Sequence, residues 1–298
     1  MPNLTGVRRK YARKLRRKAQ LKSRLLVRAF AEVPREQFLG PGPWQISPGR
    51  RRPRRFRPRP FRSPYRPTRD SHPRHIYQDI LVGIVPERLL NNGMPSALAK
   101  WFEALALKRG ERVMHIGCGT GYYSAILAHV VGPTGHVIAL EIDKDLAERA
   151  RANLSSRRNV EMLNADGTTH DPGDVDAIFV NAGANRPCPL WLDRLKPGGR
   201  LIFPLVMLGR RNRPGPWGVM IKVTRRDNGY DASIVSMVGI FPCIGAIDQA
   251  DDALVADAFK RRSKQKIRSL RRDPHEASSS CWLHGRDFCL STDALSKP

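Results

Sequence analysis

The sequence predicts an α/β fold built on a doubly wound, mostly parallel sheet. Three observations predict it. From about Tyr77 onward short apolar runs alternate with helix-like runs, three glycines follow one of these apolar runs, and acidic residues end the next two. Strands that alternate with helices form βαβ units, whose right-handed crossovers place successive strands parallel in one sheet.

Positive charge is concentrated at the N-terminal end of the chain. Residues 1 to 75 carry 23 Lys and Arg against three Asp and Glu, whereas the remaining residues carry 30 and 24. A mildly basic body therefore carries a strongly basic front end. The Arg-rich start is similar to a transit peptide but lacks an apolar signal core, so a targeting role is not expected.

Two basic segments make up this front end. Residues 8 to 32 place apolar side chains at helical spacing, which predicts one basic helix. Residues 49 to 70 hold ten arginines and several prolines, so this segment is expected to be disordered or polyproline-like when free. It is either a solvated insertion without a role or an arm for nucleic acid, where Phe56, Phe61 and Tyr65 would stack on bases.

Cysteine spacing and hydropathy limit the classes of protein to which the chain can belong. The five cysteines are widely spread and show no CxxC pair, so neither a zinc site nor a disulfide framework is suggested, and no metal is expected. A reducing, cytoplasmic location fits this pattern. No apolar run approaches the roughly 20 residues needed to cross a bilayer, so no membrane contact is expected.

The elements of the predicted sheet follow one another at regular spacing. Pro95 suits the first turn of a helix, and an acidic residue caps the helix that begins at 143. The expected helices cover residues 95 to 108, 121 to 131, 143 to 154 and 189 to 195. The expected strands cover residues 112 to 116, 136 to 142, 159 to 166, 175 to 183 and 200 to 206.

Two further strands complete a seven-stranded sheet. The runs WGVMIKVTR and DASIVSMVGIF alternate in polarity and flank Asn228-Gly229, a strong hairpin signal, so an antiparallel C-terminal hairpin is expected at the sheet edge. Residues 251 to 270 are predicted to form a last amphipathic helix. The segment SCWLHGRDFCLST is expected to end the chain as a compact apolar patch.

The glycines of ERVMHIGCGTGYYSAIL raise the question of a ligand. They lie at positions 117, 119 and 121 between a strand and a helix, where the backbone approaches a ligand closely and the helix offers unpaired N–H groups. A tight turn would use the same residues. Glu141 ends the next strand, 20 residues after Gly121, where a carboxylate accepts both hydroxyls of a ribose. Together with Asp166 after the third strand, and the spacing GxGxG, this favours adenosyl-methionine over a dinucleotide.

The same motifs carry a family resemblance. RVMHIGCGTGYYSAILAHVVGPTGHVIALEIDKDLAERARANL, followed by ADG, VDAIFVNAGA and RLKPGGRLIFPL, resembles the class I methyltransferases, which are Rossmann-like, and most closely the protein-L-isoaspartate O-methyltransferase family. RAFAEVPREQFLG and YQDILVG are similar to that family's N-terminal signatures. The resemblance covers roughly residues 25 to 45 and 76 to 245 and implies S-adenosyl-L-methionine as cofactor.

The resemblance also implies roles for individual residues. The three loop glycines would cradle the methionine portion, Glu141 the ribose and Asp166 the adenine. His115 stands where the family usually has an acid, and it is equally well explained as a core histidine. The full set of expected cofactor-binding residues is His115, Gly117, Gly119, Gly121, Tyr122, Glu141, Asp166, Gly167 and Asn181.

The chain departs from the family in its acceptor loop. Where the family has GQTIS.P, with a hydroxyl beside the transferred methyl group, this chain has RLLNNGMPS. Alignment at Pro95 places Asn92 and Gly93 over the Ile-Ser pair, so the hydroxyl is absent. Ser96 would replace it only if the loop is rearranged, and the amides of Asn91 and Asn92 are alternative donors. Asn92 and Ser96 are therefore the candidate catalytic residues.

Three functions follow from these observations. The first is an enzyme that esterifies a protein or peptide carboxylate, as in protein repair; this needs alignment and water exclusion but no general base. The second is a methyltransferase on another acceptor, and the third a nucleic-acid-binding protein without turnover. The expected organisation is a basic helical segment (1–48), an Arg/Pro-rich disordered insertion (49–75), a methyltransferase domain (76–245) and a C-terminal helix and tail (246–298).

Overall fold

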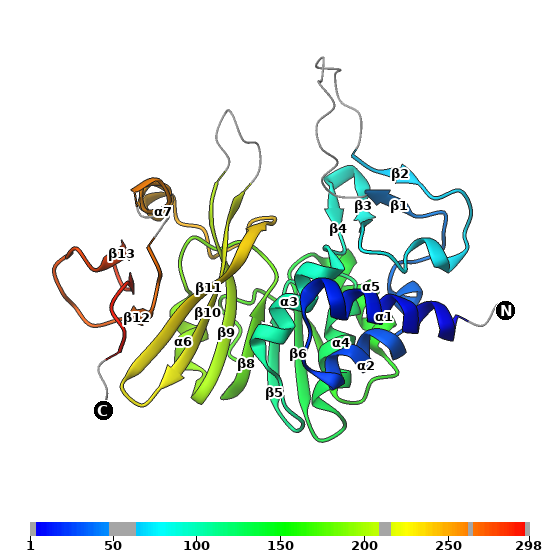
Figure 1. The fold of residues 1–298 in the computed structure, drawn as a ribbon, viewed down its shortest axis with the longest axis horizontal. Coiled ribbons are helices and arrows are strands. Elements are labelled where there is room, and N and C mark those ends of the chain that lie inside the picture. The colour runs from blue at the N-terminus through cyan, green and yellow to red at the C-terminus, as the bar shows by residue number, and fades with distance from the viewer. Residues whose placement is uncertain (1–3, 48–63, 209–215, 262–264, 296–298) are drawn as a thin grey trace, which may run out of the picture.

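The computed structural model describes residues 4–47, 64–208, 216–261 and 265–295, and a long twisted sheet runs through it (Figure 1). The strands lie in the order β13 (Cys281–His284), β14 (Cys289–Ser291), β12 (Ser269–Arg271), β11 (Gly229–Gly239), β10 (Trp217–Arg226), β9 (Leu195–Met207), β8 (Val175–Val180), β5 (Arg112–Ile116), β6 (His136–Glu141) and β7 (Val160–Asn164).

The parallel part of this sheet contains the switch point, where the direction in which successive strands are added reverses. Strands β5 to β9 pair in parallel, as the βαβ pattern predicts. The chain builds outward from β5 through β6 to β7, then returns to the other side of β5 with β8 and β9. The crevice beyond the carboxyl ends of β5 and β8 is therefore where ligands bind in sheets of this kind.

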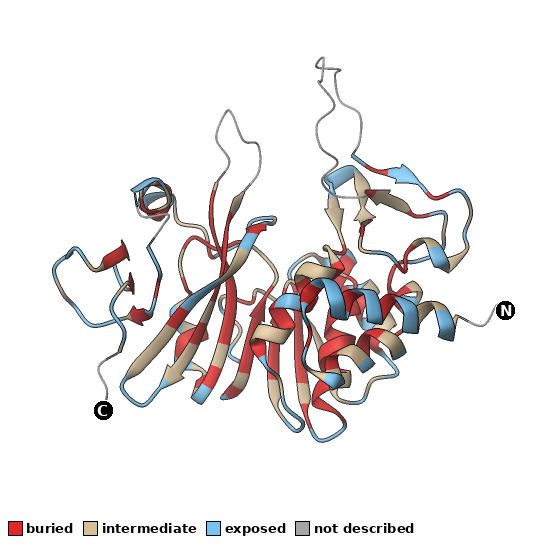
Figure 2. Cartoon of the chain, in the orientation of Figure 1, coloured by how far each residue is buried: buried red, intermediate tan, exposed pale blue. Residues whose placement is uncertain are grey.

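Helices cover the sheet on both faces. One face carries α1 (Thr5–Ala19), α2 (Arg24–Glu32), α3 (Pro95–Leu105), α4 (Tyr122–Val131) and α5 (Lys144–Leu154), and the other α6 (Pro189–Asp193) and α7 (Gln249–Arg261). Side chains alternate between the faces, so that Val113 lies in one core and Met114 in the other. Figure 2 shows the inner strands buried between these layers.

The predicted seven strands are present, and the sheet is longer than predicted. The predicted hairpin of β10 and β11 is present; Arg226 pairs with Gly229, so the two turn residues are Asp227 and Asn228. The expectation of a helix over 251 to 270 was wrong at its end: α7 stops at Arg261, and residues 269–271 form β12. The apolar C-terminal patch forms β13 and β14, because strands bury its alternating apolar side chains and pair its backbone with β12.

The N-terminal segment is two helices instead of the single helix predicted for residues 8 to 32. Gln20 takes a left-handed backbone conformation with φ of 55° and ends α1. Ser23 caps α2 by accepting the Leu26 N–H at 3.2 Å. The chain reverses direction between α1 and α2, so the apolar sides of both helices pack into the core on the same face of the sheet. A single straight helix could not do this.

Part of the expected disordered insertion is ordered. Residues 48–63 lie outside the described residues. From Pro64 onward the chain packs on the body: β2 (Arg66–Pro67) pairs with β1 (Gln45–Ser47), and Tyr65 is buried with its hydroxyl donating to the Leu89 carbonyl at 2.9 Å. Together with β3 (Leu81–Val85) and β4 (Leu90–Asn91), these two strands form a second sheet in the order β2-β1-β3-β4.

A buried arginine fixes the approach to β3. Arg35 begins a short 3-10 helix (Arg35–Phe38), and its side chain is fully buried. Its guanidinium donates to the carbonyls of Ile76, Gln78 and Ile80 at 2.6, 3.2 and 3.3 Å. This is the arginine of the VPRE signature, and it holds the YQDIL segment that leads to the acceptor loop. Among the described residues, no helix is both long and apolar enough to cross a bilayer.

Candidate active site

The glycine loop joins β5 to α4 at the switch point. Gly117, Gly119 and Gly121 have φ of 73°, 58° and 90°, which side chains with a Cβ rarely adopt. A Cβ on Gly121 would lie 2.8 Å from Leu154 Cδ1, so this glycine lets α5 pack closely. A Cβ on Gly117 or Gly119 would come no closer than 3.4 and 3.5 Å to other atoms. At these two positions the left-handed backbone, more than a steric clash, accounts for the glycines.

Glu141 lies against this loop at the end of β6. Its carboxylate accepts the Gly119 N–H at 2.8 Å and the Asp143 N–H at 3.1 Å. The residue is 8% exposed. Burial raises the pKa of the Glu141 carboxyl, and the two N–H donors oppose that rise. An anion held in this way keeps free lone pairs for hydroxyl donors.

The ends of β7 and β8 complete the site. Asp166 Oδ1 accepts the backbone N–H and the hydroxyl of Thr168, both at 2.8 Å. Asn181 donates its amide to the Gly117 carbonyl at 3.3 Å, and its backbone N–H to Ile116 at 2.8 Å. Gly167 is buried, and a Cβ there would lie 2.5 Å from Ile116. Glu141 and Asn181 thus contact the glycine loop, and Asp166 follows the neighbouring strand β7; their contacts with a cofactor stay a prediction.

Two predicted cofactor contacts face the core instead. His115 is fully buried, and its Nδ1 lies 2.8 Å from Ser124 Oγ. Burial lowers the pKa of His115 to about 3, so the imidazole is neutral. The Tyr122 ring is also fully buried, with Phe38 and Tyr123 at centroid distances of 5.7 and 4.9 Å. Strand alternation turns His115 toward α4, and helix geometry turns Tyr122 inward, so neither side chain reaches the crevice.

The acceptor loop between β4 and α3 cannot carry a serine at position 93. Gly93 has φ of 69°, and a Cβ there would lie 2.8 Å from Leu98 Cδ2. Asn91 shapes the turn by accepting the Gly93 N–H at 2.9 Å. Asn92 is 7% exposed, and its Nδ2 has no hydrogen-bond partner among the described residues. Of the two asparagines, Asn92 therefore keeps an unused donor.

Ser96 does not replace the missing hydroxyl. Its Oγ donates to Asp79 Oδ2 and its backbone N–H to Asp79 Oδ1, both at 2.8 Å. Asp79 also pairs with Lys18. The expected catalytic role of Ser96 is thus at odds with its contacts, because its hydroxyl is bound to the Asp79 carboxylate, which also accepts the Ser96 N–H in the first turn of α3. Asp79 and Arg35 were missed as positioning residues, although both lie in the YQDILVG and VPRE stretches.

Two segments enclose the crevice. From the β3–β4 hairpin, Ile84 Cδ1 lies 3.5 Å from the position of a Cβ on Gly119, and Arg149 of α5 donates to the Ile84 carbonyl at 2.9 Å. From the loop after β11, a Cβ on Gly245 would lie 3.1 Å from Asp166 Oδ2. This loop is tied to Gly183 through the Phe241 carbonyl and the Cys243 N–H at 2.6 and 2.7 Å.

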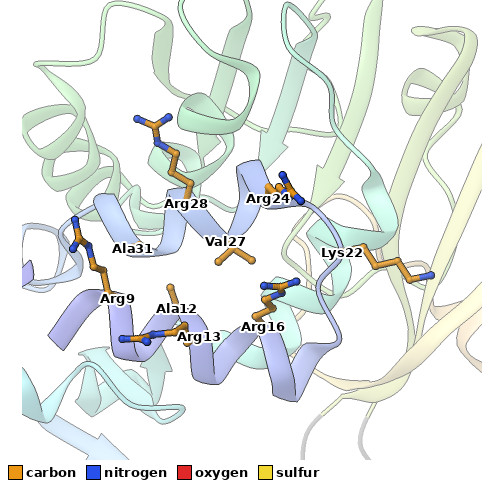
Figure 3. Close-up of a pocket in the computed structure, with 9 residues that line it drawn as sticks. All are labelled: Arg9, Ala12, Arg13, Arg16, Lys22, Arg24, Val27, Arg28 and Ala31. Atoms are coloured by element: carbon orange, nitrogen blue, oxygen red, sulfur yellow. The ribbon is translucent and has the colours of Figure 1, made fainter. Parts of the chain in front are cut away.

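A second candidate surface lies on the N-terminal helices, away from the glycine loop. Figure 3 shows a groove between α1 and α2 with a volume of about 460 Å³ and an apolar floor of Ala12, Val27 and Ala31. Six exposed basic side chains surround it: Arg9, Arg13, Arg16, Lys22, Arg24 and Arg28. In the part of the chain that the structure describes, Arg28 alone of these pairs with an acid, Glu32.

The switch-point site defines the class of protein. A left-handed glycine loop after the first parallel strand, an acid at the end of the next strand and a second acid after the third are the arrangement of a class I S-adenosyl-methionine-dependent methyltransferase. The family model described as Protein-L-isoaspartate(D-aspartate) O-methyltransferase (PCMT) matches residues 62–237. The chain belongs to the protein-L-isoaspartate O-methyltransferase family.

Individual relatives agree with this assignment. The protein-L-isoaspartate O-methyltransferase of Ignicoccus hospitalis is 36% identical over 154 residues, which are 50% of this chain and 70% of the relative. That of Thermotoga maritima is 29% identical over 195 residues, 63% of this chain and 53% of the relative. The matched segments thus cover 70% and 53% of the lengths of these two relatives.

Solved structures show the same fold. A protein-L-isoaspartate O-methyltransferase matches with a TM-score of 0.61 and 23% identity, over 85% of this chain and 69% of that one. A structure from Plasmodium falciparum, described as a complex with S-adenosyl-L-homocysteine, matches with a TM-score of 0.57 and 18% identity, over 79% and 97% of the two chains.

Proposed function

We propose that this protein transfers a methyl group from S-adenosyl-methionine to a carboxylate of a protein or peptide, as the names of its relatives imply. The observation that supports this best is the convergence of the glycine loop, Glu141, Asp166 and Asn181 on one crevice. When bound, the cofactor supplies an activated methyl group on a sulfonium centre. The remaining steps fall to the residues of the chain.

The proposed binding roles follow from the donors and acceptors present. Glu141 accepts hydrogen bonds from two ribose hydroxyls, since its carboxylate has lone pairs beyond those used by Gly119 and Asp143. Asp166 Oδ2 accepts from the adenine amino group, while Oδ1 stays bound to Thr168. The glycine loop, with left-handed backbone at Gly117 and Gly119, lets the backbone approach the methionine portion without intervening side chains.

The proposed role of Asn92 is to orient the acceptor. A carboxylate is already an anion, so the enzyme needs to align it and exclude water, and needs no general base. The unpartnered Nδ2 of Asn92 is a donor that an acceptor carboxylate would satisfy. Because Gly93 admits no side chain, this amide takes the place of the family's hydroxyl.

A protein or peptide acceptor fits the rim of the site. Phe241 and Ile244, in the loop that contacts Asp166, are 41% and 64% exposed, and Met237 at the end of β11 is 63% exposed. Exposed apolar side chains next to a polar crevice are typical of surfaces that bind a polypeptide. A small free acid would leave them uncovered.

The test is methyl transfer by the purified full-length chain. We expect labelled methyl groups to pass to an isoaspartyl peptide and not to the matching aspartyl peptide, with the ester recovered by its lability in base. Binding of the cofactor product without transfer to the isoaspartyl peptide would contradict the proposal. RNA and DNA panels run alongside would then reveal a different acceptor.

As a second function we propose that the α1–α2 groove binds nucleic acid. Its six basic side chains and apolar floor suit a phosphate backbone, since Arg and Lys release counterions from phosphates. Affinity for a single-stranded RNA should fall steeply with salt and should fall further in the variant Arg13→Glu/Arg24→Glu. Lys260→Glu, an exposed substitution on α7, is the control; equal loss in both variants would contradict a specific groove.

A further inference from the structure

A cluster of metal-binding side chains lies at the end of the sheet farthest from the candidate active site. His275, Cys281, His284 and Cys289 each offer one ligand atom, and these four atoms all lie within 4.8 Å of one another. Cys281 and His284 belong to β13 and Cys289 to β14, whereas His275 comes from the preceding loop. We propose that these four residues bind one zinc ion, which fastens the C-terminal extension (residues 265–295).

The donor set suits zinc. Two thiolates and two imidazoles form a tetrahedral, closed site for Zn²⁺, with bonds of about 2.3 Å to sulfur and about 2.0–2.1 Å to nitrogen. Those bond lengths place neighbouring ligand atoms about 3.3–3.8 Å apart on a tetrahedron. The separation of Cys281 Sγ and His275 Nε2 is 3.6 Å. The other separations are at most 4.8 Å, so they would contract by up to about 1–1.5 Å around the ion.

Neighbouring groups orient the ligands. His275 Nδ1 donates to the Asp273 carbonyl at 2.8 Å, which leaves the lone pair on Nε2 facing Cys281. Cys281 Sγ accepts the Ser278 N–H at 3.3 Å. The pairing of β13 with β14 sets His284 opposite Cys289. Outer contacts of this kind fix the ring tautomer and stabilise the thiolate in metal sites.

Burial indicates that the cluster needs a bound ion. Cys281 and Cys289 are 4% and 0% exposed. His284 Nδ1 is buried and has no hydrogen-bond partner among the described residues, a state that costs free energy unless another group satisfies it. A disulfide between the two cysteines would leave His284 Nδ1 unsatisfied and His275 Nε2 without its thiol neighbour, whereas one zinc ion binds all four side chains.

The position in the fold indicates a structural role. Four protein ligands leave no open coordination position for catalysis. In the strand order, the extension lies beyond β11 at one end of the sheet. The glycine loop follows β5, near the opposite end (Figure 1). Strands β12, β13 and β14 have only three, four and three residues, so a bound ion would add a constraint to their few backbone pairs and apolar contacts.

Sequence spacing did not reveal this site. The ligands form the pattern His-x5-Cys-x2-His-x4-Cys, which lacks a CxxC pair. The hairpin of β13 and β14 and the loop that carries His275 bring them together. Binding requires the thiols to release their protons to solvent, so the site depends on a reduced protein.

The first experiment measures metal in the full chain, purified without a polyhistidine tag or chelator. We expect roughly one zinc per chain by mass spectrometry of the metal. Cys281→Ser and Cys289→Ser should lose most of it, and Cys243→Ser and His136→Gln should keep it. Wild-type metal no higher than in Cys289→Ser, or a Cys281–Cys289 disulfide in the freshly purified protein, would overturn the proposal.

A second measurement covers the case in which the ligand variants do not fold. Cobalt added to metal-free wild type should give sulfur-to-cobalt charge-transfer and tetrahedral d–d absorption, and zinc should abolish both. Chelation should then open residues 265–295 to protease while binding of S-adenosyl-homocysteine persists. Absence of the cobalt spectrum would refute the site, and an unchanged protease pattern after metal removal would refute its structural role.

Discussion

The backbone N–H of Gly119 donates a 2.8 Å hydrogen bond to Oε2 of Glu141. This contact joins the glycine loop after β5 to the end of β6, so the loop and the acid are positioned by each other. A change at Glu141 therefore acts on both the proposed ribose contact and the conformation of the loop.

Replacement of Glu141 by alanine should weaken cofactor binding. Two ribose hydroxyls would lose a charged acceptor, at an expected cost of about 1.5–3 kcal/mol, which is about a 10- to 150-fold rise in Kd. Calorimetry with S-adenosyl-homocysteine measures it. Glu161→Ala, on the exposed side of β7, is the control, and equal affinity of Glu141→Ala and wild type would remove Glu141 from the site.

Replacement of Asn92 by alanine should lower methyl transfer and leave cofactor affinity intact. The side-chain Nδ2 has no partner among residues 4–47, 64–208, 216–261 and 265–295, so its loss should not reduce thermal stability. An effect confined to kcat/KM for the acceptor is the signature of a lost acceptor contact. Robust turnover by an Asn91→Ala/Asn92→Ala double variant would show that the loop amides play no part.

Replacement of Ser96 by alanine should affect stability more than catalysis. The variant loses the hydrogen bond to the charged Asp79 carboxylate at the start of α3, worth about 1.5–3 kcal/mol, while transfer should stay within about twofold of wild type because the hydroxyl faces Asp79. Urea unfolding and steady-state kinetics measure the two effects. A large loss of transfer at unchanged stability would restore the catalytic role suggested by the sequence.

His115 should make the protein sensitive to acid. Burial depresses its pKa from 6.5 to about 3, so below pH 6.5 the unfolded chain binds a proton that the folded chain does not. Stability from this group is complete above pH 6.5 and is lost as the pH falls toward 3, by about 1.4 kcal/mol per pH unit. His115→Gln should flatten the dependence of the free energy of unfolding on pH between 6.5 and 4, whereas His136→Gln should not. Parallel curves for His115→Gln and wild type would contradict the burial argument.

The Arg/Pro-rich segment should be dispensable only in part. Deletion of residues 49–62 should leave the melting temperature and cofactor affinity nearly unchanged. Deletion of residues 49–70 should lower the melting temperature, because it removes Tyr65, β2 and Thr68, whose Oγ1 accepts the Trp44 N–H at 3.0 Å. Equal stability of the two deletions would show that the contacts of residues 64–70 contribute nothing.

Much of the parallel sheet, and the positions of the loop glycines and of Glu141 at its edge, could be predicted from the sequence. Strand and helix periods, the Asn228-Gly229 turn and the loop glycines are local patterns, and each specifies the backbone within a few residues. Glu141 and Asp166 could be placed because the carboxyl ends of parallel strands meet at one edge of the sheet.

Tertiary structure alone decided which way individual side chains point and which distant segments meet. His115 faces α4 because strand neighbours alternate between faces, and Ser96 is bound to Asp79, 17 residues earlier in the chain. Arg35 binds carbonyls about 40 residues away. The cluster of His275, Cys281, His284 and Cys289 exists only once β13 and β14 pair. Contacts of this kind depend on packing between elements, and packing leaves no periodic signal in the sequence.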